Sequence, residues 1–352
     1  MKLANALKGY GTTLARLDED GERILSLWRE GLSQRNRPEA KFDWYYRRNP
    51  EGPPIAVFLT HGAEGELVGV ASAGTRRMRY GSRVLKAGAM VDFIVAPGHR
   101  SLFPALFLQR AVCRQALETC ALLFGMPNPK SAATVKRAGY RLVGQLVRRV
   151  RILRSSGYLS RYLPRWISHI GGAAIDGIRQ GAARLSMLRA RGFRAEWLER
   201  PDARFDDLWA RAVAPETLMG VRDSAFLAWR FVDFPLHAHR FVAVFSTSDG
   251  RLVAYAACEE EQQVLLVRDF LVDPTVPGAW TRLWAELSCE AWARGHASIS
   301  VEFLGSALLQ HRLAAAGYLA RGQQPVYAVL PAELAALANE ERWYVTHADE
   351  DV

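Results

Sequence analysis

Several features common in other proteins are scarce or missing in this sequence of 352 residues. It has only four cysteines and no Cys-x-x-Cys pair, which favours a reducing compartment, and Cys113 and Cys120 are interpreted as buried thiols. No apolar run reaches membrane-spanning length. The first twenty residues lack the apolar core of a secretory signal. We therefore expect a cytoplasmic protein.

Motifs for several kinds of catalysis are also missing. The sequence has no G-x-S-x-G elbow, Walker loop or dinucleotide-binding glycine pattern, so a covalent intermediate is not indicated. His237 and His239 are the only close histidine pair, and no carboxylate stands at ligand spacing near them. Two ligands do not make a metal site, so we expect no metal.

Lysine is scarce as well, with 6 lysines against 40 arginines and a net charge of +10. Residues 146–194 contain eleven of the arginines and only one acid, Asp176, while apolar residues recur at helical spacing over 158–170. This stretch fits a solvated connector between domains. It also fits a peripheral contact with an anionic membrane, or a surface for nucleic acid or another anionic carrier. No DNA-binding motif appears elsewhere.

The order of predicted elements between residues 88 and 140 suits the binding of a pyrophosphate. Gly88–Pro97 reads as a strand, residues 99–101 as a basic turn and Leu102–Leu117 as a helix. A helix N-terminus offers free N–H groups and a positive dipole end to an anion, and Arg100 adds a charge. A second strand, Ala121–Gly125, leads to Asn128 between two prolines and then to a short helix.

These residues resemble the GNAT acyltransferase superfamily. Val95–Arg100 is similar to its V-x-P-x-x-R strand exit, and Asn128 followed by Gly139-Tyr140 is similar to its late Asn…Gly-aromatic helix. After Arg100 the chain reads Ser101-Leu102-Phe103, about two residues short of the family pattern and without its glycines, which allow close backbone approach to phosphate. The family's late-helix tyrosine falls on Val135.

The resemblance implies an acyl-coenzyme A site in the first part of the chain, with acetyl-CoA or a longer acyl-CoA as co-substrate. The backbone of the strand before the turn would bind pantetheine and the thioester carbonyl. Asp92 is the preferred base, with a structural carboxylate as the alternative, and His99 is either a phosphate ligand, a base or a solvated side chain. The implied donor-binding residues are Phe93, Ile94, Val95, His99, Arg100, Ser101, Leu102, Phe103 and Asn128.

A second copy of the same plan follows in the chain. Trp44–Pro50 matches Trp229–Pro235 and Glu64–Val68 matches Asp249–Val253, both 185 residues later. Blocks at 92–97 and 138–140 recur 177 and 178 residues later. We expect four segments: a GNAT-like domain at 1–150, a basic connector at 151–194, a second GNAT-like domain at 195–335 and a tail at 336–352. The second copy lacks a basic residue in its turn, so we expect it to shape the acceptor site or pack on the first copy.

The predicted fold is therefore α+β, with two GNAT-like domains, each a mixed and mainly antiparallel sheet flanked by helices, joined by a basic helical connector. Trp44 and Trp229 occur at matching positions and are interpreted as core residues. Tyr45, Arg47 and Arg48 differ between the copies, so they are the candidate acceptor ligands.

The resulting expectation is acyl transfer from acyl-CoA to an amine by direct attack in a ternary complex. By resemblance to tandem GNAT proteins of bacterial envelope and polysaccharide assembly, the acceptor would be an amino sugar, a sugar nucleotide or a lipid-linked glycan. Two alternatives remain open. One is a binding module that keeps the fold without the reaction, and the other is a relative of the transferases that use aminoacyl-tRNA.

Overall fold

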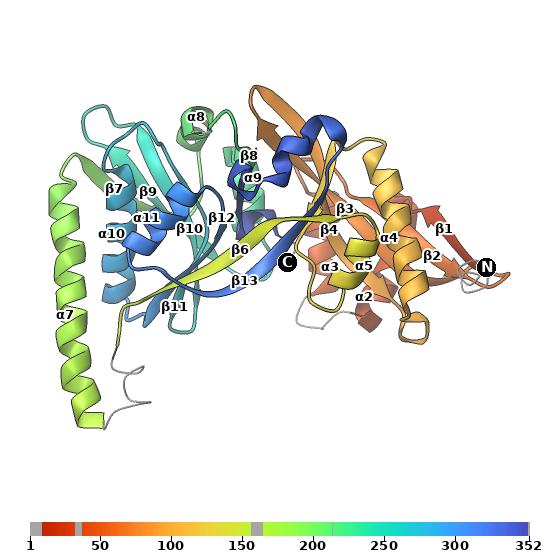
Figure 1. The fold of residues 1–352 in the computed structure, drawn as a ribbon, viewed down its shortest axis with the longest axis horizontal. Coiled ribbons are helices and arrows are strands. Elements are labelled where there is room, and N and C mark those ends of the chain that lie inside the picture. Colours follow the sequence, from red (N-terminus) through yellow and green to blue (C-terminus); the bar gives the residue numbers. More distant parts are fainter. Residues whose placement is uncertain (1–8, 32–36, 156–164, 213, 351–352) are drawn as a thin grey trace.

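The computed structural model describes residues 9–31, 37–155, 165–212 and 214–350, apart from the side chains of 165–175 and 189. Its strands form one continuous sheet in the order β1-β2-β3-β4-β5-β13-β6-β12-β11-β10-β9-β7. Two lobes, each with helices against its part of the sheet, lie side by side (Figure 1). Among the described residues, no helix has both the length and the apolarity to cross a membrane.

The first lobe contains these elements in chain order: β1 (Tyr10–Leu14), α2 (Leu17–Gly31), α3 (Pro38–Phe42), η2 (Asp43–Arg47), β2 (Ile55–His61), β3 (Glu66–Tyr80), β4 (Arg83–Val95), η3 (Pro97–His99), α4 (Leu102–Leu117), β5 (Leu122–Gly125), α5 (Ala132–Arg137) and β6 (Arg141–Ile152). The helix predicted at Leu102–Leu117 and the strand before it are confirmed.

The connector and the second lobe repeat this order: α7 (Arg165–Arg189), β7 (Phe193–Leu198), α8 (Ala203–Ala212), β8 (Leu218–Gly220), α9 (Ser224–Leu227), η4 (Ala228–Val232), β9 (His239–Ser246), β10 (Leu252–Glu261), β11 (Val264–Val272), α10 (Ala279–Ala293), β12 (Ser298–Leu304), α11 (Ala307–Ala315) and β13 (Leu319–Val329). The tail adds η5 (Ala332–Ala338), η6 (Glu340–Arg342), β14 (Trp343–Thr346) and η7 (His347–Asp349).

The repeated blocks at 64–68 and 249–253 both form hairpin turns, because each has a glycine where the backbone must adopt positive φ. Gly65 (φ 68°) joins β2 to β3, and Gly250 (φ 71°) joins β9 to β10. The two copies thus begin their sheets in the same way, which agrees with the duplication read from the sequence.

The two lobes exchange their last strands. β6 comes from the first copy but pairs with β12 of the second, and β13 comes from the second copy but pairs with β5 of the first. β6 and β13 also pair with each other, and they cross the middle of the molecule between the lobes (Figure 1). Each predicted domain therefore borrows a strand from the other, a feature that the segment limits at 150 and 335 did not include.

A pair of tryptophans at matching positions of the two copies joins the lobes. The rings of Trp44 and Trp229 stack with centroids 4.6 Å apart and planes at 12°. Each indole N–H donates to the backbone oxygen of the other residue, at 2.8 Å from Trp44 and 3.0 Å from Trp229. Both side chains are buried, which agrees with their interpretation as core residues.

The basic connector is helical over α7, which begins directly after Pro164. Ala183 and Ala190 are buried, whereas Ile178, Leu185 and Leu188 are exposed. The side chains at 158–170 that the sequence places on one apolar face lie outside the description. Asp176, the only acid of the stretch, is buried and accepts from the backbone N–H of Ser155.

Candidate functional site

The strand predicted to bind the donor has a free edge in the first lobe. β4 runs parallel to β5 from Ala87 to Ala89, and beyond Ala89 no described strand pairs with β4 on that side. The two strands are still close one residue after the last pair, since a Cβ on Gly125 would lie 2.7 Å from the Cβ of Met90. We refer to the unpaired region between the carboxyl ends of β4 and β5 as the gap.

A bulge lies where the gap begins. Asp92 has φ 51°, and Asp92 and Phe93 together face one residue of β3, because the register with β3 shifts between Val70 and Ser72. After the bulge Ile94 pairs with Val70, and the N–H of Ala96 donates to Val68 at 2.8 Å. The alternation of an antiparallel strand therefore turns the N–H and C=O of Val95 toward the gap.

Asp92, the predicted base, is enclosed beside this bulge. Its side chain is 1% exposed, the Nζ atom of Lys41 lies 2.8 Å from Oδ1, and the Tyr46 hydroxyl donates to Oδ2 at 3.0 Å. A buried carboxylate with an ammonium and a hydroxyl as partners is satisfied in place. This geometry agrees with the structural alternative, and a role as base stays a prediction.

The basic turn after β4 directs its two charged side chains differently. Arg100 reaches back, and its Nε donates to the oxygen of Val95 at 2.8 Å, at the mouth of the gap. His99 points the other way, where its Nδ1 atom lies 2.8 Å from the Tyr10 hydroxyl. Ser101 is the N-cap residue of α4 but makes no capping bond with its side chain. Leu102 is exposed and Phe103 is half-buried at the start of that helix. Arg100 is thus the cation beside the gap.

Asn128 has a local structural role at the start of α5. Its side-chain oxygen accepts from the N–H groups of Lys130 and Ser131, each at 3.0 Å. Such a turn fixes the backbone after β5. The residue is exposed, and its predicted contact with the donor stays a prediction.

The predicted acceptor residues fall in two environments. Tyr45 is 6% exposed and packs against Trp44 and Trp229 in the core between the lobes. Arg47 and Arg48 are exposed. The Arg47 guanidinium lies 5.2 Å from the centre of the Phe42 ring, and Arg48 pairs with Asp43 at 2.8 Å. The arginines, but not Tyr45, remain accessible to a ligand.

The corresponding gap in the second lobe is filled by the chain's own tail. β11 and β12 run parallel from Val264 to Val267, and beyond that point β14 pairs with β12 at Phe303 and Leu304. β6 covers the opposite edge of β12 as far as Phe303, so β14 lies on the side of β11. The Tyr344 hydroxyl donates to the oxygen of Phe270 on β11, which closes the gap.

A buried charge network holds the tail in this position. Asp269, at the position that matches Asp92, accepts from the hydroxyls of Tyr255 and Thr346, each at 2.6 Å. Arg222 is fully buried. Its Nε atom lies 3.3 Å from Oδ1 of Asp269, and its Nη2 atom lies 2.5 Å from Oδ2 of Asp349. The aspartate therefore acts as a structural anchor in the copy whose gap is closed.

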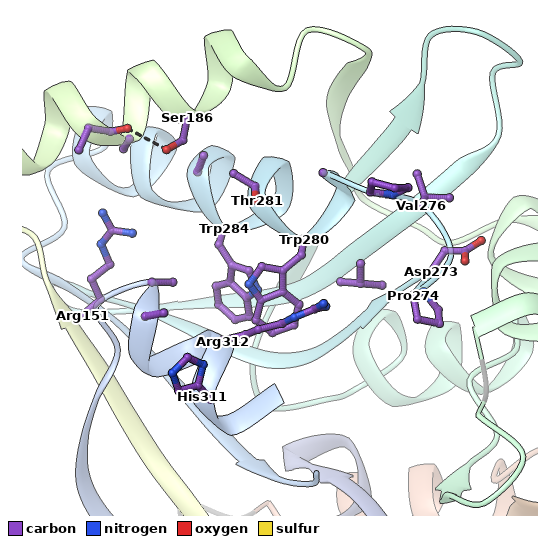
Figure 2. Close-up of a pocket in the computed structure, with 18 residues that line it drawn as sticks. Arg151, Ser186, Asp273, Pro274, Val276, Trp280, Thr281, Trp284, His311 and Arg312 are labelled. Carbon is purple, nitrogen blue, oxygen red and sulfur yellow. Dashed lines mark hydrogen bonds between the residues drawn. The ribbon is translucent and has the colours of Figure 1, made fainter. Parts of the chain in front are cut away.

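A cavity of about 650 Å³ lies in the second lobe, at the turn between β11 and α10. Figure 2 shows Trp280 and Trp284 side by side on α10, with Arg312 of α11 next to them and Arg151 of β6 farther along the wall. Neither guanidinium makes a hydrogen bond or an ion pair with another described residue. Asp273 also lines the cavity, but Arg211 and Thr275 bind its carboxylate.

The same cavity shows what the sequence reasoning missed. The turn of the second copy has no basic residue of its own, yet β6 and α11 bring Arg151 and Arg312 to it. The α10 N-terminus opens there with Gly278 at its N-cap (φ 90°) and no capping side chain. Only the strand exchange shows that β6 belongs to this wall, so no local pattern could have found Arg151.

A second group that sequence spacing did not predict surrounds Glu259. Its carboxylate lies 3.6 Å from His237 and 3.5 Å from His239, and Arg268 donates to it at 2.7 Å. Burial opposes ionisation, but hydrogen bonds from His239 and Arg268 lower the pKa of Glu259 to about 2. The carboxylate next to the histidine pair therefore comes from a neighbouring strand, β10.

Comparison with known proteins supports the fold. No family model and no curated protein matches the sequence. The structure is similar to a probable N-acyltransferase from Enterococcus faecalis V583 (10% identity, TM-score 0.63, 91% of this chain and 72% of that chain). It is also similar to a GCN5-related N-acetyltransferase from Anabaena variabilis ATCC 29413 (12% identity, TM-score 0.63, 91% and 72%).

The structure is similar to a third protein over nearly the whole length of both chains. It is a tandem GNAT protein from the clavulanic acid biosynthesis pathway (11% identity, TM-score 0.52, 91% of this chain and 98% of that chain). These likenesses confirm the predicted fold: two GNAT-like domains in one chain.

Proposed function

We propose that this protein transfers an acyl group from acyl-CoA to an amine, with the donor bound in the first lobe. The proposal rests on the free edge of β4 beyond Ala89, where no described strand pairs with it on the β5 side. In the second lobe β14 lies at the matching position, where it pairs with β12 and bonds to β11 through the Tyr344 hydroxyl. A thioester arm needs such an edge, since its amides bind strand backbone as another strand would.

Some residues around the gap would bind the acyl-CoA donor, and others would orient its thioester. The N–H of Val95 faces the gap, and the bulge at Asp92–Phe93 marks where the acyl carbonyl would lie. Arg100 and the uncapped N-terminus of α4 would hold the pyrophosphate. With both reactants bound, the amine would attack the thioester carbonyl directly. The C–N bond would form, the C–S bond would break, and CoA would leave as the thiol after taking up the proton that the amine loses. An amino sugar or another envelope precursor is the acceptor class we propose.

Calorimetric titration with acetyl-CoA and a longer acyl-CoA tests this assignment, and the second lobe provides a matched control. Arg100→Glu reverses the charge at the first gap, and Arg312→Glu reverses the charge at the second-lobe cavity. We expect Arg100→Glu to weaken acyl-CoA binding at least about tenfold, the equivalent of one lost charged hydrogen bond. Arg312→Glu should leave binding in the first lobe unchanged. The opposite result would place the donor in the second lobe.

A non-catalytic binding module is the second candidate, and the second-lobe cavity favours it. The cavity combines two indoles with two guanidinium groups that make no hydrogen bond or ion pair with described residues, next to a gap that β14 has closed. Such a site suits an anionic ligand with a flat ring and no extended arm. Saturable binding that Arg312→Glu abolishes, together with no turnover of acyl-CoA over a set of amines, would support the module instead.

The exposed side of α7 supports one further part of the proposal, a peripheral contact with an anionic membrane. Ile178, Leu185 and Leu188 are 75%, 46% and 57% exposed, and Arg179 and Arg184 are exposed beside them. Apolar and cationic side chains on one helix fit an anionic lipid surface. The protein should sediment with anionic liposomes at low salt, and a triple change of the three apolar residues to Ser should abolish this. Equal sedimentation of both proteins would contradict it.

A further inference from the structure

Three potential metal ligands from separate elements meet at the outer side of the first lobe. They are His61 at the end of β2, Glu66 at the start of β3 and His99 in η3. One ligand atom from each lies within 4.8 Å of the other two. In the sequence, His99 follows Glu66 by 33 positions (99 − 66), so no ligand spacing indicates the group.

The geometry of the group is close to what a transition metal requires. With metal–nitrogen bonds of 2.0–2.1 Å, tetrahedral ligand atoms stand about 3.4 Å apart, so rotation of side chains at the surface closes the remaining distance. The two imidazole rings already lie with centroids 4.9 Å apart. Glu66 is exposed, while both histidines are half-buried. The two histidines would therefore form the preformed part of a metal site, and the Glu66 side chain would rotate to complete it.

A fourth residue orients one of the histidines. The Tyr10 hydroxyl lies 2.8 Å from Nδ1 of His99, and the Tyr10 ring lies 4.6 Å from that of His61. Histidine ligands in metal sites commonly have their second ring nitrogen bound in this way, which fixes the tautomer and the ring plane. Bonding at Nδ1 leaves Nε2 of His99 as the ligand atom.

The second lobe shows that the fold does not require this group. The duplicated positions hold Ser246, Arg251 and Val276 in place of His61, Glu66 and His99. An arginine instead of the glutamate would repel a cation. The three ligands therefore belong to the first lobe alone, the lobe whose gap between strands stays open.

We propose that His61, Glu66 and His99 bind a divalent transition metal such as Zn²⁺, with an open fourth position at the surface. Two imidazoles and one carboxylate are a donor set that suits Zn²⁺. A metal here would tie the β2–β3 hairpin to the turn at Pro97–His99. That turn leads into Arg100, so the metal would fix the position of the cation next to the gap. This role does not depend on the proposed acyl transfer.

Titration of tag-free, chelator-treated protein with Zn²⁺ against a chromophoric competitor tests the proposal. We expect one tight equivalent, and at least about 100-fold weaker binding in His61→Ala and in His99→Ala, since loss of even an outer partner costs roughly 10- to 100-fold. Tyr10→Phe removes such an outer partner and should weaken Zn²⁺ binding roughly tenfold. His311→Ala removes an exposed histidine of the second-lobe cavity and should leave the affinity for Zn²⁺ unchanged.

A second readout separates metal binding from damage to the fold. Substitution with Co²⁺ should give the visible absorption of a tetrahedral site in the wild type and in His311→Ala, but not in His61→Ala. Each variant should keep the circular dichroism of the wild type. No tight equivalent of Zn²⁺ in the wild type, or equal binding in the His61→Ala/His99→Ala double variant, overturns the proposal.

Discussion

Removal of the Asp349 carboxylate should strongly destabilise the second lobe. Asp349 is fully buried and lies 2.5 Å from Arg222 and 3.1 Å from Arg76, two arginines that are themselves buried. Loss of one partner from a buried ion pair costs about 3–5 kcal/mol, because the remaining charge has no water to solvate it. Without Asp349, each arginine would still have one carboxylate partner: Asp269 lies 3.3 Å from Arg222, and Glu51 lies 2.9 Å from Arg76. We therefore expect a loss near the lower limit, about 3 kcal/mol, for Asp349→Ala.

Urea unfolding followed by circular dichroism measures this loss as a lower midpoint at an unchanged slope. Glu216→Ala is the control, since it removes an exposed ion pair with Arg342 and should leave the midpoint unchanged. A loss below about 1 kcal/mol for Asp349→Ala would refute the reasoning, because it would mean that water reaches Arg222 when the tail loses its carboxylate.

The same carboxylate makes stability depend on pH in a defined direction. Burial alone would raise the pKa of Asp349, but the charges of Arg222 and Arg76 bring it below its usual value. A depressed pKa contributes stability above the unfolded value of about 3.9, and this contribution is lost as the pH falls through the folded value. Asp349→Asn should therefore reduce the slope of stability against pH below about pH 4.

Three further predictions concern the interior. Trp44→Ala should cost about 3–5 kcal/mol in urea unfolding, since it removes the stack with Trp229 and the hydrogen bond from the Trp44 indole to the backbone oxygen of Trp229; an unchanged midpoint would show that the lobes do not depend on this pair. Burial, with Arg268 and Arg230, holds the pKa of His347 well below 6.5, so stability should fall as the pH drops below about 6.5, and His347→Gln should reduce that slope. Burial raises the pKa of the Cys258 thiol, so a thiol reagent should label it only after unfolding.

Local patterns in the sequence determined the elements of the fold and their duplication. The helix at Leu102–Leu117 begins and ends where its apolar periodicity predicts, and both hairpins turn at the glycines that permit positive φ. These predictions succeed because helix period, strand alternation and turn chemistry depend on residues close in the chain. The matching blocks at 44 and 229 likewise place the two tryptophans that stack at the centre.

The tertiary structure decided which side chains meet, and therefore which site is open. No local pattern shows that β14 closes one gap while the other keeps a free edge, or that β6 crosses to the second lobe with Arg151. Nor does spacing reveal that Lys41 satisfies Asp92, or that His61 and His99 approach each other. Such contacts join residues tens to hundreds of positions apart. They form because the whole sheet fixes the strand order, which the period of one segment does not encode.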